Sequence, residues 1–151
     1  MFCFFEPEMD AQMQARRAME HDLRKALVAG EFELYYQPIV NLESNEIASV
    51  EALIRWHHPD NGTIQPAMFI PLAEEIGFIV PLGEWVLREA CAAATRWSEP
   101  LTVSVNLSPT QFRSPGLVQA VVDALGDSGL PPERLELEIT EMVLLSNNEA
   151  T

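Results

Sequence analysis

Two glutamates and an asparagine stand late in three short segments where apolar and polar residues alternate, and their side chains could hold a metal ion. They are Glu51, Asn106 and Glu138. Because strand side chains alternate between faces, each lies opposite the apolar face of its own segment. Carboxylate and amide oxygens are the hard ligands that suit Mg²⁺ or Mn²⁺. Two carboxylates brought together without a cation repel each other and raise their pKa values, and a metal ion removes that conflict.

Arg55 and Gln37 extend this polar set toward a phosphorylated ligand. Arg55 follows Glu51 by four residues on the same strand face, which places it about 13 Å further along an extended strand. A guanidinium at that position can bind a phosphate that a metal at Glu51 also touches. Gln37 lies on an earlier alternating segment and shares a face there with Glu33 and Tyr35.

The same residues have a structural interpretation that the pattern leaves open. An alternating strand with one polar face is often simply half solvated, which would explain Glu136 and Glu138 without any chemistry. Gln37 can be an ordinary polar residue of a strand. Asn106, which precedes Leu-Ser-Pro, can be a residue that turns the chain at a strand end.

The pattern around these side chains predicts helices and strands in alternation. Helices are expected over 9–29, 66–75, 82–97 and 116–125, strands over 32–40, 47–56, 101–107 and 135–139, and the start of a helix over 141–151. The first two strands should form a hairpin, in which Pro38 needs an edge, an end or a bulge because it lacks an N–H. Residues 57–65 are expected to form a loop, where His57 and His58 lack a third metal ligand and are solvated.

The order of elements after the hairpin indicates a parallel sheet or barrel. If helices cover the apolar strand faces, the polar faces point into the barrel, and Glu51, Asn106 and Glu138 lie at its active-site end. A (β/α)₈ barrel needs about 250 residues, whereas this chain has 151. We therefore predict an α/β fold, a TIM-like (β/α)₈ barrel truncated to about its first half.

Composition narrows the range of partners and compartments. Nine Lys and Arg against 23 Asp and Glu give a net charge of −14, which disfavours nucleic acid and anionic membrane as partners. The sequence has no apolar stretch near the length of a membrane span and no signal peptide, and Cys3 and Cys91 form no disulfide or zinc motif. We expect a cytoplasmic protein, which a region upstream of this chain could tether to a membrane.

Five short motifs occur in an order and at a spacing that are specific to one protein family. The motifs are Tyr35-Tyr36-Gln37-Pro38-Ile39, Val50-Glu51-Ala52-Leu53-Ile54-Arg55-Trp56, Phe69-Ile70-Pro71-Leu72-Ala73-Glu74, Val105-Asn106-Leu107-Ser108 and Leu137-Glu138-Ile139-Thr140-Glu141. From about residue 20 to the last residue, the chain resembles the EAL domains, which are cyclic di-GMP phosphodiesterases.

This resemblance implies a barrel related to (β/α)₈ whose first strand runs antiparallel to the rest, in agreement with the expected hairpin. It implies hydrolysis of one phosphodiester bond of cyclic di-GMP, with Mg²⁺ or Mn²⁺, to give linear pGpG. The site residues that it implies are Glu51 and Glu141 as catalytic residues, the latter by holding a catalytic loop in place, Gln37 and Arg55 as substrate contacts, and Glu51, Asn106 and Glu138 as metal ligands.

The beginning of the chain resembles the junction between a GGDEF domain, which is similar to diguanylate cyclases, and an EAL domain. Residues 1–8 are similar to the end of a GGDEF domain, 9–30 to a linker helix, and 31–151 to the N-terminal half of an EAL domain. The implied partners are cyclic di-GMP, an upstream GGDEF-like or sensor domain, and a second copy in a homodimer of the intact protein.

Two hypotheses follow, because the 151 residues lack the Asp-Asp-Phe-Gly-Thr-Gly loop and the catalytic Lys that the family has after the position of Glu141. In the first, the chain is part of a cyclic di-GMP phosphodiesterase and is inactive alone. In the alternative, it is a non-catalytic module that binds cyclic di-GMP or a protein partner through an incomplete barrel, whose open sheet edges could pair with another chain.

Overall fold

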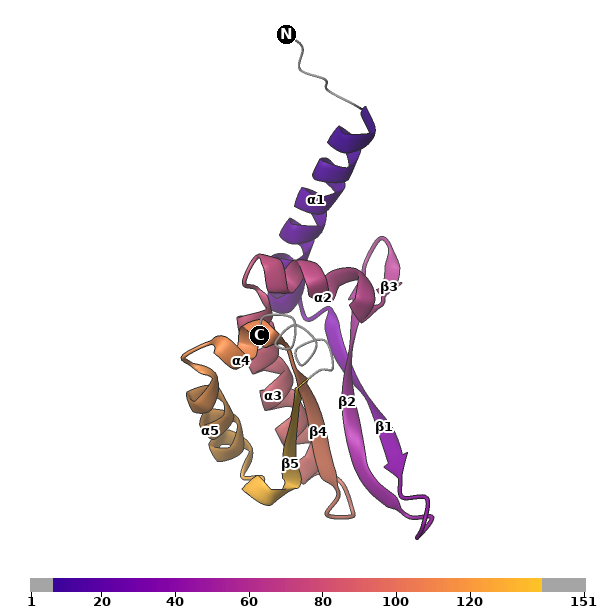
Figure 1. Ribbon diagram of the computed structural model, residues 1–151, viewed down its shortest axis with the longest axis vertical. Helices are drawn as coiled ribbons and strands as arrows, with labels where there is room; N and C mark the ends of the chain where they lie inside the picture. The colour runs from indigo at the N-terminus through magenta and orange to yellow at the C-terminus, as the bar shows by residue number, and fades with distance from the viewer. Residues whose placement is uncertain (1–6, 140–151) are drawn as a thin grey trace, which may run out of the picture.

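The protein is described by a computed structural model over residues 7–139, with side chains from Met9 onward. The helices are α1 (Pro7–Ala29), α2 (Pro66–Glu75), α3 (Ile79–Thr95), α4 (Pro109–Arg113) and α5 (Leu117–Ser128), and the strands are β1 (Phe32–Val40), β2 (Ile47–His58), β3 (Gly62–Ile64), β4 (Thr102–Leu107) and β5 (Leu135–Ile139). A 3₁₀ turn, η1 (Pro132–Arg134), precedes β5. Helix α1 projects from one end of the molecule, and the tip of the β1–β2 hairpin projects from the other (Figure 1).

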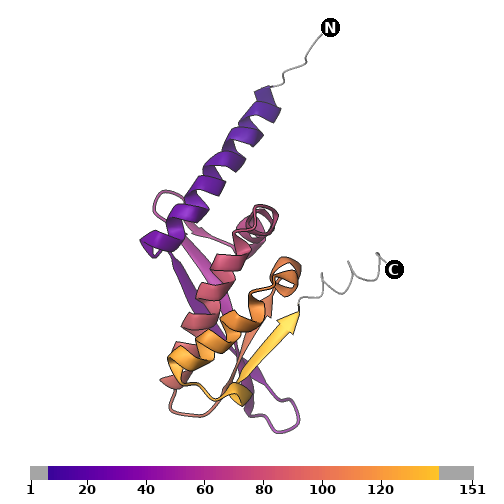
Figure 2. The same ribbon diagram turned by 90° about the vertical axis from the view of Figure 1, so that its left-hand side faces the viewer.

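One mixed sheet forms the frame, with the strand order β1-β2-β4-β5 and β3 paired to β2. Strands β1 and β2 are antiparallel, whereas β4 runs parallel to β2 on one side and to β5 on the other. Helix α3 packs along the sheet and α5 packs beside α3 (Figures 1 and 2). This arrangement confirms the predicted α/β class, the partial barrel and the antiparallel first strand.

Local residue preferences explain most of the element bounds. The predicted bounds of the strands over 32–40 and 135–139 and of the helix over 66–75 are confirmed. Pro38 lies on a strand with no partner on its outer side within residues 7–139, next to a register shift between Ile39 and Val40, as its missing N–H requires. Helix α5 runs past Gly126 and ends before Gly129, whose φ of +78° is readily adopted only by glycine.

Two predictions around the helices and loops are wrong in detail, and one helix has no counterpart in the predictions. Residues 57–65 are not a loop, because β2 continues to His58 and β3 pairs with it across a tight turn at Gly62, which has φ +71°. Helix α3 begins at Ile79 rather than at residue 82, since Pro81 is tolerated in the first turn of a helix. Helix α4 was not anticipated, and it depends on a capping box between Ser108 and Gln111.

The buried apolar side chains of residues 9–139 form two clusters. The first joins α1, α2, α3 and the β1–β2 hairpin, and its largest buried side chains are Trp56, Phe69 and Leu23. The second lies between the sheet, α3 and α5, and it includes Val103 and Val105. On the apolar faces that alternation predicts for the strands over 47–56 and 101–107, most side chains are buried, but Ala48 at the start of β2 is exposed. The opposite faces carry the polar residues.

The C-terminal part of α1 is attached to β2 by a buried polar contact. His58 is buried rather than solvated as the sequence predicted, and its Nε2–H donates to Asp22 Oδ2 at 2.8 Å. The Nδ1 atom of the same ring accepts the backbone N–H groups of Asp60 and Asn61. Because both ring nitrogens have partners, a polar group can be buried here without the usual cost. None of the described helices is long and apolar enough to span a membrane.

Asp22→Ala should lower the free energy of unfolding by roughly 1–3 kcal/mol, because it leaves the buried Nε2–H of His58 without an acceptor. Urea denaturation of the wild-type and variant chains measures this. Glu20→Ala is the matched control on the same helix, since it removes only an exposed ion pair with Arg24 at 3.9 Å. Equal stability of the two variants would contradict the role given to Asp22.

Candidate functional site

The polar faces of β2, β4 and β5 meet in one row of side chains. Asn106 Nδ2 donates to Glu51 Oε1 at 3.2 Å, which joins β2 to β4 through their side chains. Glu138 lies directly opposite Asn106 in the parallel register of β4 and β5. The structure therefore brings together the three residues that the sequence suggested as metal ligands.

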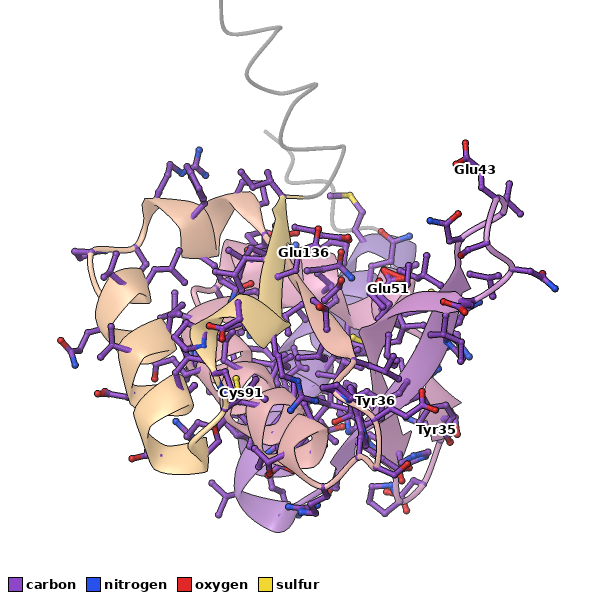
Figure 3. The ribbon with its side chains drawn as sticks, turned by 90° about the horizontal axis from the view of Figure 1, so that it is seen from below. Tyr35, Tyr36, Glu43, Glu51, Cys91 and Glu136 are labelled. Carbon is purple, nitrogen blue, oxygen red and sulfur yellow. The ribbon has the colours of Figure 1, made fainter. Side chains whose placement is uncertain are left out.

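Two further residues of this row were not singled out for chemistry by the sequence. Ser104 lies between Glu51 and Glu136 in the register of β2, β4 and β5, and its hydroxyl donates to Glu136 Oε2 at 3.2 Å. Glu51 and Glu136 lie on the same face of the sheet (Figure 3). The available signal was strand alternation, since Glu136 shares its face with Glu138 and Ser104 shares its face with Asn106.

The carboxylates of Glu51, Glu136 and Glu138 repel one another. Burial raises the pKa of Glu138 above its ordinary value, and the negative charges of Glu51 and Glu136 raise the same pKa further. The ionised form of Glu138 is thus disfavoured by its surroundings, because partial burial removes some of its hydration and two like charges lie near it. A site with this tension favours a bound cation or a proton.

A hard cation fits this donor set in part. Across residues 7–139, no three His, Cys, Asp or Glu side chains are arranged as a metal site on their own, and the set consists of two carboxylates and one amide. The amide of Asn106 turns its nitrogen toward Glu51, and a half-turn of this amide would present its oxygen instead. Three protein oxygens would leave the other positions of an octahedral Mg²⁺ to water and to a ligand.

The two candidate substrate residues lie at different distances from this row. Gln37 is exposed on β1 and is the register partner of Glu51, so it borders the carboxylates. Arg55 lies further along β2, where its guanidinium stands 5.3 Å from the centre of the Tyr35 ring. Its Nη1 also donates to the carbonyl of Ile54 at 3.0 Å. Glu141, the other residue expected in the site, falls outside the described residues.

A cavity of about 560 Å³ opens beside Asn106, where the recorded pairing of β2 with β4 ends at Ala52 and Val105. Its walls are mostly apolar and come from β2, α2, α3 and the β4–α4 connection; they include Leu53, Pro66, Ile70, Pro71 and Val86. The Glu74 carboxyl also lines it, with a pKa that burial raises and Arg113 partly lowers. Sequence patterns did not indicate this cavity, because it depends on where two strands separate.

The connection after Asn106 is held by a buried side chain. Ser108 Oγ accepts the backbone N–H of Gln111, and Gln111 Oε1 accepts the backbone N–H of Ser108. Gly83 of α3 lies so close to Gln111 that a Cβ atom at this glycine would overlap the side-chain amide. A glycine at this position therefore lets α3 approach the segment that positions Asn106.

The chain is similar to a known protein family and to several known proteins. The family model described as the EAL domain matches residues 20–151. The chain is 52% identical over 141 residues to an uncharacterised protein of Sinorhizobium fredii, and this match covers 93% of the chain and 17% of that protein. It is 43% identical over 154 residues to the bifunctional diguanylate cyclase/cyclic di-GMP phosphodiesterase MucR of Pseudomonas aeruginosa, covering 99% of this chain and 22% of MucR.

Solved structures agree with these relatives. The fold is similar to that of the PaMucR phosphodiesterase in complex with c-di-GMP, with a TM-score of 0.79 and 42% sequence identity. That match covers 88% of this chain and 56% of the other. The chain thus spans only part of the length of the proteins that it matches.

Glu138→Gln should stabilise the metal-free protein at neutral pH. The raised pKa of Glu138 means that its carboxyl binds a proton more tightly in the folded state than in the unfolded chain, so the ionised carboxylate destabilises the fold and a neutral amide does not. The contribution of Glu138 to stability is full at low pH and is lost as the pH rises from about 4.5, the ordinary value, through the raised pKa. We expect a small gain at pH 7, because solvent screens the exposed part of this carboxyl. Urea denaturation in EDTA at several pH values measures it.

The matched control for this prediction is Glu133→Gln, which removes one negative charge at an exposed position of η1. It should change the stability little at any pH. If Glu138→Gln were no more stable than the wild type at pH 7, the carboxylates would not be in the electrostatic conflict described above.

Gly83→Ala should lower the free energy of unfolding by about 1–3 kcal/mol, because the new methyl group displaces the buried Gln111 side chain from its capping contacts. Thermal and urea denaturation measure the loss. Gly126→Ala is the control, since nothing lies near that glycine in α5 and alanine is favoured in a helix interior by about 1 kcal/mol. Opposite signs for the two substitutions are expected; equal signs would contradict the packing role of Gly83.

Proposed function

The chain belongs to the EAL domain family, and from this premise we propose that the protein it is part of hydrolyses cyclic di-GMP to linear pGpG. The observation that carries the proposal is the contact between Asn106 and Glu51, which joins β2 to β4 beside Glu138. The names of MucR and of the PaMucR complex with c-di-GMP support the choice of substrate.

We infer that Glu51, Asn106 and Glu138 hold Mg²⁺ or Mn²⁺ in the working enzyme. Oxygen donors of this kind suit these ions, and a cation would offset the negative charges of Glu51 and Glu136 that help to raise the pKa of Glu138. When bound, the cation would neutralise charge on the phosphate and make a coordinated water more acidic. Glu141 remains the proposed residue that holds a catalytic loop in place.

The other site residues would bind and orient the ligand. Arg55 would donate to a phosphate oxygen, and Gln37, beside Glu51, would hydrogen-bond to the ligand near the reacting phosphate. The cavity next to Asn106 has apolar walls, among them Leu53 and Pro66, against which the flat face of a guanine can pack. This division gives the phosphate and the base separate subsites.

The remaining parts of the proposal concern the regions around the site. Residues 31–151 would be the N-terminal half of the EAL domain, and α1 would link it to an upstream GGDEF-like or sensor domain. Homodimerisation would involve the intact protein rather than the described residues alone. The location that we propose for this part of the protein is the cytoplasm, where cyclic di-GMP is a signal.

The donor set also supports a second candidate function for these residues taken by themselves. Three oxygens suit one cation, whereas hydrolysis by two metals needs a second set of donors, which residues 7–139 do not show. We therefore propose that the 151 residues alone do not turn over cyclic di-GMP and act, if separated, as a binding module for it.

Glu51→Gln, Asn106→Ala and Glu138→Gln should each reduce the phosphodiesterase activity of the full-length protein by about 100-fold or more, because each removes a proposed metal ligand. Chromatographic separation of cyclic di-GMP from pGpG, with Mg²⁺ and with EDTA, measures this. Glu43→Gln, which removes the same charge on the β1–β2 loop away from the site (Figure 3), should retain full activity.

Activity in EDTA, or full activity of Glu51→Gln, would contradict the metal role. The 151-residue chain tested in the same assay should give no pGpG, while isothermal titration calorimetry with cyclic di-GMP and Ca²⁺ should still detect binding. Turnover by the separated chain would contradict the proposal that a second donor set is needed.

A further inference from the structure

Arg55 has an acidic neighbour that it does not use. In the antiparallel register of β1 and β2, Glu33 stands directly opposite Arg55, where opposite charges normally pair across the strands. Yet none of the ion pairs among the described residues includes Arg55. A cross-strand pair with Glu33 would neutralise the guanidinium that the proposed function assigns to the ligand, so the absence of this pair needs a cause.

His57 supplies that cause by binding Glu33 itself. The Nε2–H of His57 donates to Glu33 Oε1 at 2.8 Å. The other ring nitrogen, Nδ1, lies 3.2 Å from Thr63 Oγ1 on β3, which is the register partner of His57. The imidazole is therefore held from both sides, between β1 and β3, and the Glu33 carboxylate is directed toward it.

The contacts that Arg55 does make leave its charge in place. The ring of Tyr35, labelled in Figure 3, lies under the guanidinium at 5.3 Å, and the Ile54 carbonyl accepts from Nη1 at 3.0 Å. An aromatic face and a neutral carbonyl both hold a cation without neutralising it. Within residues 7–139, the other N–H groups of Arg55 have no hydrogen-bond acceptor and can act as donors.

We propose that His57 and Tyr35 are positioning residues for Arg55: His57 holds the competing Glu33 carboxylate away from the guanidinium, and Tyr35 fixes the guanidinium in place, so that Arg55 meets an anionic ligand already oriented and unpaired. The proposal rests on the proposed function, which gives Arg55 a phosphate of cyclic di-GMP. Neither positioning residue is required to touch the ligand. Without His57, ligand binding would first have to break a pair between Glu33 and Arg55.

A double-substitution cycle in the full-length protein tests this. His57→Val keeps a good strand residue but releases Glu33, and it should raise the KM for cyclic di-GMP by about 3- to 5-fold with kcat nearly unchanged, which is the upper part of the range for exposed charge pairs. Adding Glu33→Gln should return the KM to within about twofold of the wild type, because the competing carboxylate is gone. Glu33→Gln alone should leave the KM unchanged or slightly lower.

The same cycle separates a positioning role from a merely structural one. If His57 only supported the β2–β3 hairpin through Thr63, the double variant would be as impaired as His57→Val, and that result would overturn the proposal. For the aromatic contact, Tyr35→Phe should keep the wild-type KM because it keeps the ring, whereas Tyr35→Val should raise it. Equal KM values for these two variants would overturn the part assigned to Tyr35.

A measurement without ligand tests the positioning of Arg55 independently of the proposed function. In ¹⁵N-edited NMR spectra of the protein, the Nε–H signal of Arg55 should shift in His57→Val as Glu33 pairs with it, and should return in the double variant. An unchanged Arg55 signal in His57→Val would overturn the inference whatever the enzyme does. A wild-type protein that fails to hydrolyse cyclic di-GMP, but shows this shift and its reversal, would overturn the proposed function and support the positioning of Arg55.

Discussion

The register of the parallel strands β2, β4 and β5 determines which side chains are buried and which form the polar row. Because side chains alternate with a period of two, the register that buries Val103 and Val105 under α3 also places Asn106 on the opposite face. A slip of one residue would bury the asparagine and expose the valines. The free energy of burying the apolar face therefore fixes the position of the polar row, and the site needs no stabilising interactions of its own.

That independence matters because the polar row itself opposes folding. Burial and the neighbouring carboxylates raise the pKa of Glu138, so its ionised form is less stable here than in water. The described contacts within the row are few: Asn106 donates to Glu51, and Ser104 donates to Glu136. The two apolar clusters on the other face keep the strands together in spite of this repulsion. The cation that we propose would relieve this repulsion and stabilise the folded chain, which would couple ligand binding to stability.

The sequence predicts what is local, and it misses what depends on distant partners. Alternation over 101–107 and 135–139 was sufficient to sort side chains onto two faces, and the bounds of β1, β5 and α2 followed from composition and from Pro66. The sequence predicts a solvated loop at His58 because no third metal ligand stands at a useful spacing, whereas its hydrogen-bond partner Asp22 lies 36 residues away. Strand β3 and the cavity beside Asn106 likewise arise from pairing with β2 and from the separation of β2 from β4.

The surroundings of Arg55 bear on how an acidic chain could bind the doubly charged ligand that we propose. The net charge of −14 acts over long distances, where salt screens it beyond about 8 Å at physiological ionic strength. At contact distance, the individual arrangement of each carboxylate matters more. Glu33 is held by His57 at 2.8 Å rather than by Arg55. Glu51 and Glu138 would bind the proposed cation, which would compensate their negative charges. Whether Arg55 is free to meet a ligand thus depends on which partner holds Glu33, and not on the number of glutamates in the chain.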